Sequence, residues 1–184
     1  ENGGWVNARQ MSLLVGVAAA LELGRLSEAA TDLESLRDWH ARERVLMDWY
    51  WEAQLHTYLA ELSLRRGDLE RATIEAAAAR EAAMATPERT WRGRAYVTSA
   101  LVAIERRAFD EAGQYLRQAR REVRGTNAPL VAWRIEAMTA TLLERTAQPD
   151  SARRARQKYE RALERLNRPA VPTPLDPGGQ ERVH

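Results

Sequence analysis

Cysteine is absent from the sequence, and phenylalanine and histidine are scarce, with one Phe and three His in 184 residues. A chain without cysteine has no disulfide, no thiolate metal site and no cysteine nucleophile, and its compartment is left open by this criterion. The longest apolar run, Leu13–Leu21, is about half of the ~20 residues that span a bilayer, and no charged stretch precedes it as in a signal peptide. We therefore expect no membrane segment and a cytoplasmic location.

One long stretch lacks helix breakers, and the chain has little excess of one charge. Neither glycine nor proline occurs between Leu26 and Arg66, and Ala, Leu, Glu and Arg dominate the composition. These residues lose little free energy on entering a helix, so the sequence predicts an all-α fold. The 28 basic and 26 acidic residues leave a net charge of +2, which is too small to indicate nucleic-acid binding by itself.

One short pattern, a turn followed by a helix start and an alanine, occurs four times. The alanines that close it are separated by 43, 40 and 43 residues and are Ala29, Ala72, Ala112 and Ala155. Self-similarity at a fixed period is the sequence signature of a repeat array. The sequence therefore predicts about four structural repeats with a period of about 40–43 residues.

Each repeat is predicted to be a pair of antiparallel helices joined by a tight turn. Gly24 and Gly67 can adopt the positive φ that ends the first helix. Ser27, Asp68 and Asp150 are predicted to cap the second helix by accepting hydrogen bonds from its first amides. The alanine is small, which lets the two helices of a pair cross closely.

Breakers also indicate the boundaries between repeats. Thr86 before Pro87 predicts a helix that begins at the proline and runs to about Arg107, and Gly125 and Pro129 separate the last two repeats. The predicted units span residues 8–40, 48–85, 87–124 and 128–167 of a single repeat domain, 1–167. The Pro- and Gly-rich segment 168–184 is predicted to be an extended or disordered tail.

The turn and the residues after it resemble the tetratricopeptide repeat (TPR) superfamily. The residues that carry the resemblance are Gly67, Leu69 and Ala72, then Phe109 and Ala112, and the stretch Tyr159–Leu163. The resemblance covers roughly residues 8–167 and implies a right-handed α-α superhelix, or solenoid. The period exceeds the ~34 residues usual in that family, so we expect longer helices and a modified groove.

The end of the chain is similar to the C-terminal helical repeats of bacterial multidomain signalling proteins. This similarity rests on the segment Pro129–Arg134 and on Ala155, Tyr159, Ala162 and the stretch Leu175–Pro177. It implies that the chain is part of a larger bacterial regulator with a nucleotide-binding, cyclase, kinase or DNA-binding module upstream. The absence of an initiator Met and the use of a single lysine, Lys158, agree with this expectation.

The TPR resemblance implies a protein-binding groove lined by the first helix of each pair. The expected lining residues are Met11, Leu14, Ala18, Glu22, Gln54, Tyr58, Glu61, Arg65, Arg94, Val97, Leu101 and Ile104. Their chemistry predicts a peptide or helical segment with apolar anchors and one or two charges, or an adjacent domain of the parent protein. The alternative is that the chain's own tail, a neighbouring domain or a second copy in a homodimer covers this surface.

Aromatic residues are numerous for a small helical domain. Trp49, Tyr50 and Trp51 are consecutive, and successive helical side chains diverge by ~100°, so they cannot all face one core. Trp49, Trp51 and Trp91 are therefore candidate anchors for a partner. The alternative is that these rings fill the core between repeats.

Two clusters of basic residues suggest a second kind of partner. The clusters are Arg117, Arg121 and Arg124, and Arg153, Arg154, Arg156 and Lys158. If the last two repeats stack, the clusters would lie near each other and could contact nucleic acid as part of a regulatory domain. The alternative, favoured by the interleaved glutamates, is a solvated face of mixed charge.

Catalytic and metal-binding patterns are missing. Glu52 and His56 share a helix face, but no second His or Cys completes a metal site. No Gly-rich phosphate loop, serine elbow or paired-acid motif occurs. We therefore expect no catalytic residues, no metal, no cofactor and no enzymatic activity.

Overall fold

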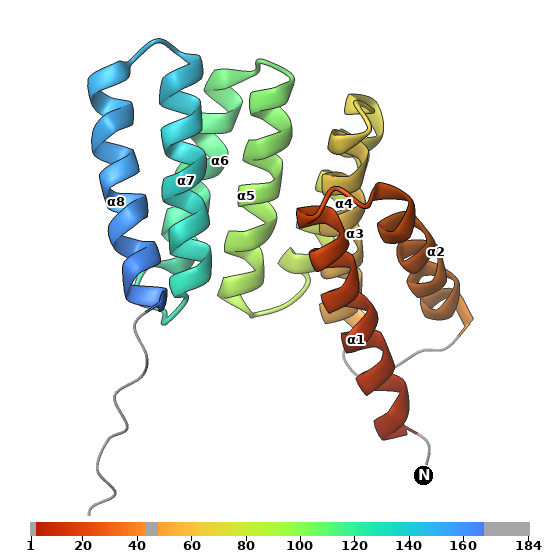
Figure 1. Ribbon diagram of the computed structural model, residues 1–184. Coiled ribbons are helices and arrows are strands. Elements are labelled where there is room, and N and C mark those ends of the chain that lie inside the picture. Colours follow the sequence, from red (N-terminus) through yellow and green to blue (C-terminus); the bar gives the residue numbers. More distant parts are fainter. Residues whose placement is uncertain (1–2, 43–47, 168–184) are drawn as a thin grey trace, which may run out of the picture.

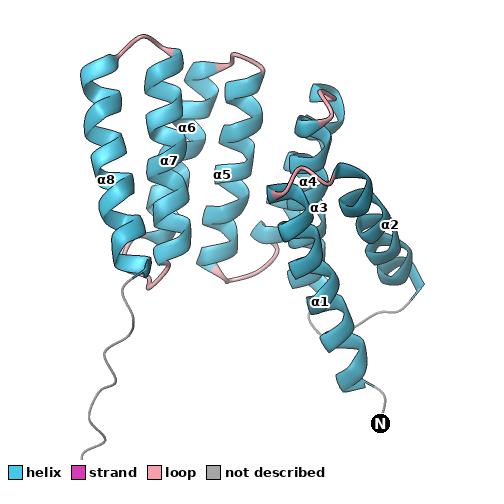
Figure 2. Ribbon diagram, in the orientation of Figure 1, coloured by secondary structure: helices cyan, strands magenta, loops and turns pink. Residues whose placement is uncertain are grey.

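The computed structural model describes residues 3–42 and 48–167, and the elements in this part of the chain are all α-helices (Figures 1 and 2). Eight helices lie within these ranges: α1 (Gly3–Glu22), α2 (Leu26–Arg42), α3 (Asp48–Arg65), α4 (Leu69–Met84), α5 (Arg89–Glu105), α6 (Phe109–Val123), α7 (Pro129–Arg145) and α8 (Pro149–Asn167). The predicted all-α fold is confirmed. The predicted tail, 168–184, lies outside the described residues.

The helices pack in consecutive pairs that follow one another across the molecule (Figure 1). We call α1, α3, α5 and α7 the first helices, and α2, α4, α6 and α8 the return helices. Each first helix packs against its own return helix and against the first helix of the neighbouring pair. Each return helix except α8 also contacts the first helix that follows it. The first helices therefore form a continuous row along one side of the array.

The four turns inside the pairs share one hydrogen-bonding pattern. The first helix is followed by a residue with positive φ, whose amide donates to the carbonyl three residues earlier, and the next amide donates to the carbonyl five residues earlier. The residues with positive φ are Gly24 (70°), Gly67 (78°), Arg107 (61°) and Ala147 (55°). Glycine adopts this conformation without strain, whereas for a residue with a Cβ atom the conformation costs about 1–2 kcal/mol.

This turn register identifies the equivalent alanine of each return helix. It lies five residues after the residue with positive φ and is buried in all four pairs, as Ala29, Ala72, Ala112 and Ala152. The prediction that Ala155 is the fourth member is wrong, because Ala152 holds that position and Ala155 lies three residues further along α8. The fourth turn therefore carries no extra residues, and the last two periods are equal.

The predicted N-caps Ser27, Asp150 and Thr86 need correction, whereas the predicted N-cap Asp68 is confirmed. The Asp68 carboxylate caps α4 by accepting from the Arg71 amide at 2.9 Å, as predicted. Ser27 and Asp150, in contrast, are the second residues of α2 and α8 and so lie inside the helices that they were predicted to cap.

The third predicted start lies at the beginning of α5, which starts two residues later than predicted. Glu88, and not Thr86, is its N-cap, and the Glu88 side chain accepts a hydrogen bond from the Thr90 amide at 3.1 Å. Thr86 Oγ1 instead accepts from the Glu88 amide and orders the turn before the helix. Pro129 begins α7, as predicted.

Close approach between helices defines the core. Ala60 on α3 and Ala72 on α4 are both fully buried and pack with Ala76 and with Val102 from the next pair. An interior of small side chains needs short interhelical distances, because no larger group is present to fill a wider space. The Ala-rich return helix α4 therefore fits tightly between α3 and α5.

We predict that Ala147→Gly stabilises the protein and that Gly67→Ala destabilises it. Both positions have the positive φ of the shared turn, and glycine relieves strain there whereas alanine creates it. The expected changes in the free energy of unfolding are about +0.5 to +1 kcal/mol and about −1 kcal/mol. Chemical denaturation measures both; equal and negligible effects would show that the turns do not hold this geometry.

Candidate functional site

A cleft of about 570 Å³ opens along the row of first helices. It reaches from the end of α1 across α3 and α5 to the first half of α7. The residues that line it are Glu22, Glu61, Leu64, Arg65, Gly67, Leu69, Val97, Thr98, Leu101, Glu105, Trp133, Arg134, Ala137 and Met138. Most of the lining side chains are apolar, and they come from α3, α5 and α7.

Helical spacing explains why these side chains converge. Val97, Leu101 and Glu105 recur every four residues on α5 and therefore lie on one face of that helix. Arg134 and Met138 do the same on α7, whose cleft-lining residues lie in its first half. The central helix α5 thus forms the floor, and α3 and α7 form the two walls.

The charged groups of the cleft are paired with one another or with close neighbours. Arg134 Nη1 lies 3.4 Å from Glu61 Oε1 and joins the α7 wall to the α3 wall. Arg65 lies 3.8 Å from Glu22 at the α1 end. Glu105, on the floor, pairs with Arg145 outside the cleft at 3.6 Å. The lining holds three carboxylates and two guanidinium groups, and each of the five is in an ion pair because Arg145, outside the cleft, balances the third carboxylate.

The structure brings some of the predicted groove residues together in this cleft. Glu61, Arg65, Val97 and Leu101 line it, as does Glu22. The placement of the other predicted residues is wrong, since these are buried away from the cleft: Leu14, Gln54, Tyr58 and Ile104. They lie on the face of each first helix that packs on neighbouring helices. The sequence pattern did not distinguish this face from the face that lines the groove.

The three remaining groove predictions are also absent from the cleft lining. Met11 is exposed on α1, and Ala18 packs against the core between α1, α2 and α3. The Arg94 guanidinium lies over the ring of Tyr58 at 5.0 Å and over the ring of Trp91 at 5.2 Å. Arg94 is therefore engaged by aromatic rings within the protein and does not line the cleft.

The predicted aromatic anchors lie elsewhere. Trp51 is only 7% exposed and packs in the core between α1, α2 and α3, so its prediction as an exposed anchor is wrong. Trp91 is half-buried, and its ring meets Tyr50 edge-on at 5.0 Å. The side chain of Trp49 lies outside the described residues. The rings of Trp51 and Trp91 fill space between helix pairs, which was the alternative left open by the sequence.

The α7 wall was missed by sequence reasoning. Trp133 contributes to the cleft and stacks on Tyr159 of α8, with ring centroids 5.7 Å apart. A signal was available, because Arg94 and Val97 shifted by one 40-residue period give Arg134 and Ala137. Both line the cleft. The groove expectation ended at the third repeat, although the same register continues into the fourth.

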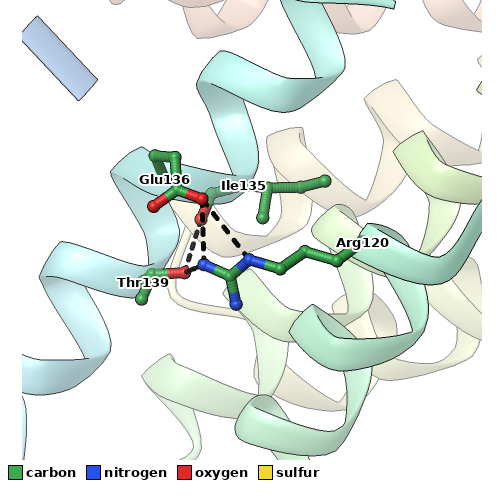
Figure 3. Close-up of polar contacts among 4 residues, drawn as sticks. All are labelled: Arg120, Ile135, Glu136 and Thr139. Atoms are coloured by element: carbon green, nitrogen blue, oxygen red, sulfur yellow. Dashed lines mark hydrogen bonds and ion pairs between the residues drawn. The ribbon is translucent and has the colours of Figure 1, made fainter. Parts of the chain in front are cut away.

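A polar cluster holds the α7 wall in place (Figure 3). Arg120 of α6 donates to Glu136 at 3.1 Å and to Thr139 at 2.7 Å, both on α7. Thr139 in turn donates to the carbonyl of Ile135 at 2.7 Å. Charge-assisted hydrogen bonds of this kind fix orientation as well as distance, so the cluster sets how α7 stands beside the cleft floor.

The two predicted basic clusters are not joined. Arg117, Arg121 and Arg124 lie on or just after α6, and the other cluster lies on α8; these two helices make no contact with each other in the described part of the chain. Arg156 pairs with Glu144 of α7, and the hydrogen bond from Arg156 lowers the pKa of this carboxylate. The helices that carry the two clusters are therefore not packed against each other.

A buried carboxylate links α3 to α4 behind the cleft. Glu75 Oε2 lies 2.6 Å from His56 Nδ1, and Glu75 Oε1 lies 2.5 Å from Arg71. Burial raises the pKa of Glu75, but the hydrogen bond and charge of His56 and the charge of Arg71 outweigh it, so the pKa is lowered from its ordinary value of 4.5. His56 is thus engaged by Glu75 from the neighbouring helix.

Residues 3–42 and 48–167 contain no group of three or more His, Asp or Glu side chains that could hold a metal ion. None of their helices is long and apolar enough to cross a membrane.

Comparisons with known proteins gave no relative. No protein-family model matches the chain, and neither the curated proteins nor the solved structures contain a match.

We predict that Glu75→Gln lowers the free energy of unfolding at pH 7 by about 1–3 kcal/mol, because it removes a buried charge-assisted hydrogen bond. The folded-state pKa of Glu75 is lowered, so its stabilising effect is present above the ordinary pKa of 4.5 and is lost as the pH falls through the lower folded value. Denaturation curves of both proteins from pH 7 to acid test this. The difference between them should shrink below the ordinary pKa; a constant difference would contradict the assignment.

Proposed function

We propose that the chain is a protein-interaction module that binds an apolar peptide or helical segment in the cleft between α3, α5 and α7. The observation that carries the proposal is the combination of apolar side chains on the α5 floor and the α7 wall with charges that are already paired. Burying the apolar side chains is favourable, whereas a charged ligand would have to compete with the existing ion pairs. Inside the cleft, a partner is therefore recognised by its apolar side chains and not by its charge.

The size and shape of the cleft support a segment of another protein as the ligand. Its volume of about 570 Å³ is within the range of ~300–1,000 Å³ that is typical of ligand sites. Trp133, Met138 and Leu101 offer a ring, a flexible thioether and a branched side chain close together. Aromatic residues and methionine are enriched at the centres of protein interfaces. A few apolar side chains of one segment would fill this space.

The finer architecture belongs to the same proposal. We infer that the four helix pairs form a right-handed superhelix of the TPR type, with the first helices on its concave side. The row of first helices and the shared turn support this assignment. The C-terminal part resembles the helical repeats of bacterial multidomain signalling proteins. We therefore propose that the module belongs to a larger bacterial regulator and has no catalytic role of its own.

We predict that Leu101→Asp abolishes binding of peptides selected on this protein, whereas Leu130→Asp does not affect it. Leu101 lies on the cleft floor, and Leu130 is 63% exposed on α7 outside the cleft lining. Short random peptides would be selected on the immobilised chain, and their affinities measured for both variants and for Trp133→Ala. The expected loss is at least about tenfold for a cleft variant, and thermal unfolding confirms that the variants remain folded.

Salt dependence distinguishes this function from nucleic-acid contact through the basic residues. Peptide binding by apolar anchors should change little between about 50 and 200 mM salt, whereas contacts to many phosphates lose ~10³–10⁵ in affinity over that range. Peptides that bind equally well to Leu101→Asp, or tight and steeply salt-dependent binding of single-stranded DNA, would overturn the proposal.

A further inference from the structure

Arg94 of α5 is a cation without a carboxylate partner. Its guanidinium lies over the rings of Tyr58 and Trp91, at 5.0 Å and 5.2 Å. No carboxylate among the described residues forms an ion pair with Arg94, and no acceptor among them takes a hydrogen bond from its side chain. The two cations of the cleft lining, Arg65 and Arg134, are both paired. Arg94 therefore carries a charge that this part of the chain leaves unneutralised.

The position of Arg94 continues the cleft floor by one helical turn. Arg94 precedes Thr98 by four residues and Leu101 by seven, so the three side chains lie on one face of α5. Thr98 and Leu101 both line the cleft. The positions of Arg94 and Leu101 are roughly 10 Å apart along the helix axis. A segment whose apolar side chains fill the cleft can therefore reach Arg94 with a residue nearby in its own sequence.

The repeat register explains why Arg94 has no partner within the protein. Arg94 and Arg134 are equivalent, because each lies thirteen residues before the residue with positive φ in its turn. Arg134 is paired with Glu61, which lies six residues before the positive-φ glycine of the turn two pairs earlier. The same position two pairs before Arg94 is Ala18. Alanine has no carboxylate, so Arg94 lacks the internal contact that neutralises Arg134.

The two rings prepare Arg94 to bind a carboxylate. A guanidinium that stacks on aromatic rings is held in one plane, and its Nη groups stay available for a bidentate contact with a planar anion. A side chain that is already held in place loses less conformational entropy when it binds a partner. Arg94 is thus oriented by Tyr58 and Trp91 without being neutralised by them.

Two buried donors in this region have no acceptor among the described residues. They are Arg94 Nε and Gln54 Nε2. Gln54 is 5% exposed and has the register position of Arg94 on the neighbouring first helix, α3, which contacts α5. Buried donors without an acceptor are rare in folded proteins. This part of the row of first helices therefore has an excess of donors and suits a group that only accepts hydrogen bonds.

We propose that Arg94 binds the carboxylate of an aspartate or glutamate side chain in the segment that occupies the cleft. The inference rests on the proposed function, and it adds one acidic residue to the apolar side chains of the partner. The partner's carboxylate does for Arg94 what Glu61 does for Arg134. One partly exposed ion pair adds only a weak dependence on salt, as expected for binding through apolar anchors.

The distance along α5 sets the spacing of the partner's residues. An extended segment advances ~3.3 Å per residue, so its acidic residue lies about three positions from the apolar side chain over Leu101. On a helical segment, which rises ~1.5 Å per residue, the separation is about seven positions.

The test is a double-substitution cycle on peptides selected on the immobilised full chain. Their C-termini are amidated, so that carboxylates come only from Asp and Glu side chains. We expect the selected peptides to share an acidic residue, and its replacement with the corresponding amide to weaken binding about five- to tenfold in calorimetric titration. With the Arg94→Gln chain the same replacement should have no effect, because the group that the carboxylate contacts is gone.

The matched control is Arg9→Gln, which removes another arginine that lies over a ring, that of Trp39 at 5.5 Å, and that is outside the cleft lining. On this chain the acid-to-amide replacement should keep its full effect. General damage by Arg94→Gln weakens the acidic peptide and its amide alike, so their affinity ratio reports the contact alone. If Arg94→Gln does not fold, Arg94→Met gives the same readout, because a methionine keeps an apolar contact with the two rings.

Selected peptides without a shared acidic residue would overturn the inference, as would an acid-to-amide effect that is the same with and without Arg94. In both cases the proposed function stands as long as Leu101→Asp abolishes binding. Binding that survives Leu101→Asp overturns the proposed function and this inference together. The two failures can therefore be distinguished.

Discussion

The structure depends on the close approach of helices at small side chains. Ala29, Ala72 and Ala112 are completely buried, and each lies at the same step after its turn. A larger residue there would separate a return helix from its first helix and move the face that the pair offers to its neighbour. At these crossings shape complementarity between small residues holds the pairs together, and larger side chains such as Leu33 and Trp51 fill the space between neighbouring helices. Polar links such as that from Arg120 to Glu136 fix orientation in addition.

The cleft is a consequence of this stacking. Because the first helices contact one another in a row, the side chains spaced by four residues on α3, α5 and α7 meet along one side. The ion pair from Arg134 to Glu61 crosses from one wall to the other and removes the charge that would otherwise select an ionic ligand. The cleft therefore arises from the same repeated contact between first helices that builds the array.

Much of the fold could be predicted because its determinants are local. Gly24 and Gly67 identify their turns, since few residues accept a positive φ. Arg107 and Ala147 adopt the same conformation without a residue that reveals it, so the fourth repeat was aligned on Ala155 in place of Ala152. The cleft was harder to predict. On a first helix, the residues that line the cleft are direct sequence neighbours of residues that pack on the preceding pair. Tyr58 was assigned to the groove for this reason and is in fact buried.

The most direct test of the central claim, that the cleft binds an apolar segment, is methyl NMR of the methionines during titration with a selected peptide. Met138 lies in the cleft, Met11 is exposed on α1 and Met84 is exposed at the end of α4. The structure predicts that the Met138 methyl signal shifts as the peptide binds, while the Met11 and Met84 signals stay in place. A peptide that shifts Met84 or Met11 and leaves Met138 unchanged would contradict the account.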